Sequence, residues 1–134
     1  MIAAIVLFWA AGLIQIGDAG VNLLLPGPLR SRENLARVSP MIRQVFLVHW
    51  FYVLLTLVIF GAACLLYARE LASGSPLARF LCASMAVFWG LRVPIQLLVF
   101  DREFRRRHRA ADVAFIAGAI FLAAVFAAAA ARTA

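Results

Sequence analysis

The stretch IQIGDAGVN, residues 14–22, lies inside an apolar segment that runs from residue 2 to residue 25. About 20 mostly apolar residues are enough for an α-helix to cross a bilayer, so this segment predicts a transmembrane helix. Gln15, Asp18 and Asn22 interrupt it at intervals of three and four residues, which places their side chains on one helix face. We expect this face to turn toward the rest of the protein, because polar groups are costly in lipid.

The composition of the whole chain is typical of a membrane protein. Of its 134 residues, 66% are hydrophobic and 14% are charged, whereas soluble domains are about half apolar and a quarter charged. Three more segments are long and apolar enough to span a membrane, at residues 45–67, 77–100 and 112–131. The sequence therefore predicts an all-α integral membrane bundle of four antiparallel transmembrane helices, forming a single domain over residues 1–134.

Local signals mark where these helices begin. Ser39-Pro40 and Ser75-Pro76 combine a serine N-cap with a proline in the first turn, which is a favourable helix start. In the loop before Ser39, the segment SRENLARV favours a short helical turn. The chain has no basic region before its first apolar run, so we expect a retained first span and not a cleaved signal peptide.

The charge distribution predicts an orientation. The net charge is +7, and arginines concentrate in the first loop, residues 26–44, and the third loop, residues 101–109. These two loops lie on the same side of an antiparallel four-helix bundle. The positive-inside rule places them in the cytoplasm, so both termini are expected outside it, with a bacterial inner membrane as the expected location.

The basic third loop, DREFRRRHR, has two interpretations. It is a topology signal, or it also binds anionic lipid head groups at the cytoplasmic face. The arginines expected to contact lipid in the second case are Arg102, Arg105, Arg106, Arg107 and Arg109. We do not expect nucleic-acid binding, because these charges sit between apolar spans and no aromatic-basic motif accompanies them.

Polar stripes recur on the second and third predicted helices. His49, Tyr52 and Thr56 have the spacing of one helix face, and so do Trp89, Arg92 and Gln96. At 1.5 Å per residue, Asp18 and Arg92 both lie on the order of 10 Å inside the membrane. The sequence therefore predicts a polar cluster in the cytoplasmic half of the membrane, made of Gln15, Asp18, Asn22, His49, Tyr52, Arg92 and Gln96.

Within this cluster we expect an ion pair. Asp18 is the acidic residue at depth, and Arg92 is the arginine at depth, whereas the other charged residues fall in loops or at span ends. A charge in the middle of a membrane helix costs about 3 kcal/mol on insertion scales. Direct pairing of Asp18 with Arg92 would offset that cost. Pro94 interrupts the same helix and frees the carbonyl of Gly90, which predicts a kink or a tolerated membrane proline.

Two functional hypotheses follow. In the first, the protein is a non-catalytic membrane component or complex subunit, and the polar cluster fixes its core. In the second, the same cluster serves a small-ligand (quinone- or lipid-like) or proton-handling protein, as a transporter or an enzyme, with Asp18 and His49 as a proton relay. The sequence offers little support for enzyme activity, because it shows no paired carboxylates, nucleophile elbow or phosphate-binding glycine loop. Whether the protein is an enzyme stays open.

The sequence gives little indication of a cofactor or a protein partner. We predict no cofactor and no metal site: His49 is a weak candidate haem ligand, because bundle haems need a second axial ligand at matching depth. Cys64 and Cys82 are expected to be two small apolar residues, although a disulfide between them is conceivable. The alanine-rich fourth span carries small residues at four-residue intervals, which suits packing within the bundle or an interface with a second copy or a membrane partner.

Overall fold

The computed structural model describes residues 1–24 and 31–132 and confirms the all-α four-helix architecture. Four helices are long and apolar enough to cross a membrane, namely α1 (Ile2–Leu24), α3 (Pro40–Leu66), α5 (Pro76–Leu98) and α7 (Arg109–Ala130). Three short helices lie in the connections, namely α2 (Ser31–Ala36), α4 (Ala68–Leu71) and α6 (Arg102–Arg107). Helix α2 confirms the expected helical turn in the first loop, while residues 25–30 lie outside the described part of the chain.

The predicted helix starts are also confirmed. Ser39 and Ser75 cap α3 and α5, and each serine hydroxyl accepts a hydrogen bond from the backbone N–H three residues later, at 3.5 and 3.3 Å. Helix α3 therefore begins at Pro40, five residues before the start of the predicted membrane span at residue 45. Gly74 has a φ of 74°, a left-handed conformation that glycine adopts easily, and this lets the chain turn from α4 into the cap of α5.

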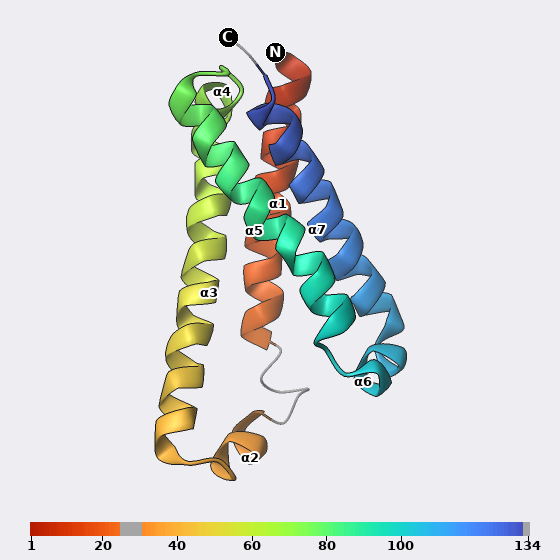
Figure 1. Ribbon diagram of the computed structural model, residues 1–134. Coiled ribbons are helices and arrows are strands. Elements are labelled where there is room, and N and C mark those ends of the chain that lie inside the picture. Colours follow the sequence, from red (N-terminus) through yellow and green to blue (C-terminus); the bar gives the residue numbers. More distant parts are fainter. Residues whose placement is uncertain (25–30, 133–134) are drawn as a thin grey trace.

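The four long helices form two antiparallel pairs (Figure 1). Helix α1 packs mainly on α3, and α5 packs mainly on α7; α1 also touches α7 and α4. The start of α1, the short helix α4 and the end of α7 lie at one end of the bundle, whereas α2 and α6 lie at the other. The two basic connections are thus on the same side of the molecule, as an antiparallel bundle requires.

The hydrophobic core is centred toward the end that carries α4. Its largest fully buried side chains include Phe8, Leu122 and Phe126, and the rings of Phe8 and Phe126 join α1 to α7 with their centroids 6.1 Å apart. In α3 the buried residues begin only at Leu57. The bundle is therefore tightly packed at one end and more open at the end with the basic connections.

Helix α7 uses part of its alanine content for packing within the chain. Ala119 and Ala129 are buried, whereas Ala127 and Ala131 are exposed. Small residues let the backbones of neighbouring helices approach closely, which agrees with the extensive contact of α7 with α5. An interface of α7 with a second copy or a membrane partner stays a prediction.

Two glycines set the distance between α1 and α3. A Cβ atom built on Gly12 would lie 2.9 Å from the carbonyl oxygen of Gly61 and 2.7 Å from Cγ of Leu65. A Cβ atom built on Gly61 would lie 2.8 Å from two carbon atoms of Ile16. The helices therefore cross at a point where side chains are missing on both, and this close approach lies one turn before Gln15, whose side chain reaches Cys64 of α3.

We expect Gly12→Ala to lower the free energy of unfolding by about 1–3 kcal/mol, because the added methyl group pushes against backbone and forces the helices apart. Gly17→Ala is the matched control in the same helix, since its Cβ would meet nothing within 4 Å. That control should be neutral or slightly stabilising, as alanine favours helix. Unfolding in mild detergent by titration with a denaturing detergent, followed by circular dichroism, measures both. Equal effects of the two variants would contradict the close crossing.

Candidate functional site

Gln15 joins three helices inside the bundle. Its side chain has no exposed surface, and its Oε1 accepts a hydrogen bond of 3.1 Å from the indole nitrogen of Trp89 on α5. Its Nε2 donates to the carbonyl oxygen of Ala11, at 3.2 Å, and to the sulfur of Cys64 on α3, at 3.5 Å. Both ends of the amide thus have partners, as a buried polar group requires.

Cys64 and Cys82 are both buried, and neither forms a disulfide.

A cavity of about 360 Å³ adjoins the Gln15–Trp89 contact, between α1, α5 and α7. Helices α1 and α5 contribute Ile14, Asp18, Val21, Trp89 and Arg92, and α7 contributes Ala111, Ala114, Phe115, Gly118, Ala119 and Leu122. This volume is in the usual range of small-molecule sites. Several lining residues of α1 and α7, among them Val21 and Ala114, are exposed on the outer surface of the bundle. The cavity is therefore reached from the side, at the level of the membrane-spanning segments.

Asp18 and Arg92 both line this cavity, but they do not pair. Asp18 is half-buried and accepts a hydrogen bond from Nδ2 of Asn22 at 3.3 Å, while the same nitrogen donates to the Asp18 carbonyl at 2.9 Å. The guanidinium carbon of Arg92 lies 5.4 Å from the centre of the Phe100 ring. Although both residues are among those described, no ion pair within 4.0 Å joins them. The two charges predicted to meet directly instead share one cavity.

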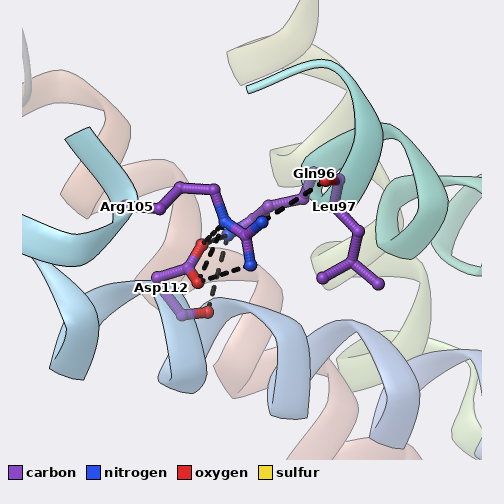
Figure 2. Close-up of polar contacts among 4 residues, drawn as sticks. All are labelled: Gln96, Leu97, Arg105 and Asp112. Carbon is purple, nitrogen blue, oxygen red and sulfur yellow. Dashed lines mark hydrogen bonds and ion pairs between the residues drawn. The ribbon is translucent and has the colours of Figure 1, made fainter. Parts of the chain in front are cut away.

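Gln96 belongs to a second polar group, shown in Figure 2, near the end with the basic connections. It is 5% exposed, and its Nε2 donates a hydrogen bond of 2.8 Å to Oδ1 of Asp112 on α7. Arg105 of α6 makes a two-pronged ion pair with the same carboxylate, with contacts of 3.0 to 3.1 Å, and also donates to the carbonyl oxygen of Leu97 at 3.4 Å. The hydrogen bonds to Asp112 raise the pKa of the Arg105 guanidinium above its ordinary value.

This second group was not anticipated from the sequence. The sequence predicts Asp112 as the first residue of the fourth membrane span and Arg105 as a contact of lipid head groups. The structure uses both to tie α6 to α7 and α5, while Arg107 pairs with Glu103 at 3.2 Å on the exposed side of α6. One feature of the sequence points to this ion pair: Asp112 lies in the first turn of a membrane helix, directly after an arginine-rich loop. Spacing along a single helix could not reveal it, because the chain bends between α6 and α7.

His49 and Tyr52 do not join the cavity, which corrects the expectation of a buried layer that includes them. Both are exposed, and Nδ1 of His49 lies 2.8 Å from the carbonyl oxygen of Val45, one turn earlier on α3. The inward face of α3 passes through Leu57, Gly61 and Cys64. Extended back by helical spacing, this face reaches the half-buried Trp50, and His49 is turned about 100° away from it.

The structure therefore separates the predicted cluster into parts. Gln15 binds Trp89, and Gln96 binds Asp112. Asp18 and Arg92 line the cavity, Asn22 bonds to Asp18, and His49 and Tyr52 are exposed. Within the described part of the chain, no group of three or more His, Cys, Asp or Glu side chains lies together in a way that could hold a metal ion.

Comparisons with protein-family models, with curated proteins and with solved structures found no match for this chain. Its function is therefore argued from the cavity and from the polar groups around it.

We expect Trp89→Phe to lower the free energy of unfolding by about 1–3 kcal/mol, because it leaves the buried Oε1 of Gln15 without its donor. Trp9→Phe is the matched control: Trp9 is 50% exposed, and the same substitution there should change stability by less than about 0.5 kcal/mol. Denaturant titration of the purified protein in mild detergent measures both. Similar losses for the two tryptophans would contradict the role of the Gln15–Trp89 bond.

Proposed function

We propose that this protein is a non-catalytic integral membrane protein that binds a small amphiphile, lipid-like or quinone-like, in the cavity between α1, α5 and α7. One observation carries the proposal: the cavity is mostly apolar, is reached from the side of the bundle, and has one acidic and one basic residue in its wall. An apolar site with a few convergent polar groups is the usual form of a small-molecule site.

The division of polar groups favours binding over a purely structural role for Asp18 and Arg92. The Gln15–Trp89 and Gln96–Asp112–Arg105 contacts already join the helices. Asp18 lies six residues before the end of α1, which corresponds to about 9 Å of helix. A charge at such a depth is costly and is by default a functional feature. Among the described residues, neither Asp18 nor Arg92 forms an ion pair that would hold two helices together.

The other functional hypotheses have less support. A proton relay requires His49 beside Asp18, and His49 is exposed on α3. Among the described residues, Asp18 is the one side chain of the cavity lining that could act as a nucleophile or base, and no serine, threonine, cysteine or histidine accompanies it there. The chemistry that the lining offers is apolar contact together with recognition of charge.

We also propose that the basic end of the bundle faces the cytoplasm of a bacterium and that both termini lie outside the inner membrane. The positive-inside rule supports this orientation, and the exposed Arg102, Arg106 and Arg109 are available to anionic head groups. Alkaline phosphatase fused after residue 134 should be active, because that enzyme folds only outside the cytoplasm. An inactive but fully expressed fusion would contradict the orientation.

Filling the cavity should weaken amphiphile binding. A side chain at Gly118 would meet nothing within 4 Å and would project into the cavity, so we expect Gly118→Leu to fold and to weaken amphiphile binding by at least about tenfold. Ala117→Leu is the matched control, since Ala117 is exposed and does not line the cavity. Protein purified in mild detergent is analysed by native mass spectrometry for bound lipids and quinones. Failure of the wild-type protein to retain any amphiphile, or equal retention by Gly118→Leu, would contradict the proposal.

A further inference from the structure

The wall of the cavity carries one charge of each sign, and each keeps unused bonding capacity. An ionised carboxylate accepts on two oxygens, and among the described residues the hydrogen bond to the Asp18 side chain comes from Asn22, at Oδ1. A guanidinium has five N–H donors. The described contact of the Arg92 guanidinium is with the face of Phe100, which uses none of those donors in a hydrogen bond. Two residues of the cavity lining thus keep unused capacity: Asp18 as an acceptor and Arg92 as a donor.

The opposite charges limit which ligands fit. An anionic head at Arg92 would lie near the Asp18 carboxylate, and a cationic head at Asp18 would lie near the Arg92 guanidinium; each arrangement adds repulsion in a medium of low dielectric constant. A neutral head leaves Asp18 with Asn22 and Arg92 with Phe100, and adds no opposite charge to either. A head that carries both charges pairs with Asp18 and with Arg92 at the same time and keeps the site electrically neutral.

Resting on the amphiphile site proposed above, we propose that its ligand has a zwitterionic head, with a primary ammonium at Asp18 and a phosphate or other anion at Arg92. The ammonium donates hydrogen bonds to the carboxylate, and the anion accepts the fork of guanidinium donors, as such pairs do elsewhere. The apolar body lies along Ile14, Gly118 and Leu122. Because the cavity is reached from the side at membrane level, the expected source is a membrane lipid with an ethanolamine-type head.

Hydrogen bonding to the cation separates this proposal from simple charge matching. A quaternary ammonium, as in a choline head, carries the same charge but has no N–H donors. It would leave Asp18 with Coulomb attraction alone. The structure thus predicts an order of affinity in which ethanolamine heads bind most tightly, choline heads less tightly and anionic glycerol heads less tightly again.

Binding of matched lysolipids to the full-length protein in neutral detergent tests the proposal. The probes share one acyl chain and differ in the head: phosphoethanolamine, phosphocholine, phosphoglycerol, and the uncharged monoacylglycerol. We expect the phosphoethanolamine lysolipid to bind at least about tenfold more tightly than the phosphoglycerol one, the size of one good charge-assisted hydrogen bond. Equal affinities for all four probes would overturn the zwitterionic head and leave the amphiphile site standing. Absence of binding for every probe would overturn both.

Substitutions at Asp18 and Arg92 are expected to change lysolipid binding in different ways. Asp18→Asn keeps the size of the side chain and should remove the preference for ethanolamine while improving the phosphoglycerol lysolipid, because the repelling carboxylate is gone. Arg92→Gln should weaken binding of all three phosphate-bearing lysolipids by about tenfold or more and leave binding of the monoacylglycerol unchanged. Arg92→Lys, which retains the charge, should recover part of the loss. An unchanged preference in Asp18→Asn would contradict the assignment of the cation to Asp18.

Free phosphoethanolamine, without an acyl chain, distinguishes the source of the ligand. Binding that is much weaker than that of the lysolipid supports a membrane lipid. Binding of equal strength supports the zwitterionic head and contradicts the lipid source. Circular dichroism and elution volume of each variant, compared with the wild-type protein, show that a loss of binding does not come from a loss of folding.

Discussion

The hydrogen bonds of a single buried amide, that of Gln15, hold the arrangement on which the cavity depends. In a membrane, helices gain little from burying apolar surface, so close packing and interhelical hydrogen bonds decide how they associate. Gln15 supplies both ends of such a connection, to Trp89 on α5 and to Cys64 on α3. The crossing at Gly12 and Gly61 holds α1 and α3 close together, and the Gln15 side chain reaches Cys64 of α3 from this region.

From this point the bundle changes character along its axis. Toward α4, aromatic and small residues close the core around Phe8 and Phe126. Toward the basic connections, α3 has no buried residue before Leu57 within the described chain, and a cavity lies between α1, α5 and α7. The Gln96–Asp112–Arg105 group ties α6 and α7 to α5 at that end. The cavity therefore lies between two groups of interhelical hydrogen bonds, Gln15–Trp89 and Gln96–Asp112–Arg105, which hold the surrounding helices in place.

The two functional hypotheses that the sequence left open apply to different residues. The structural role belongs to Gln15 and Gln96, whose amides join helices. The ligand-binding role is proposed for Asp18 and Arg92, which line the cavity without pairing. One polar face of α1 thus contains both kinds of residue one turn apart, since Gln15 and Asp18 are separated by three positions. Spacing alone assigns them to the same face, and only the neighbouring helices distinguish what each one does.

Sequence alone determined the features that depend on one segment at a time. Apolar length predicted four spans, serine and proline predicted the starts of α3 and α5, and three-to-four spacing predicted the polar face of α1. The rotation of α3 about its own axis, the pairing of Arg105 with Asp112 and the separation of Asp18 from Arg92 depend on how helices meet. They were decided by the tertiary structure, because contacts such as the Gly12–Gly61 crossing arise between residues distant in the chain, and no periodicity within one segment records them.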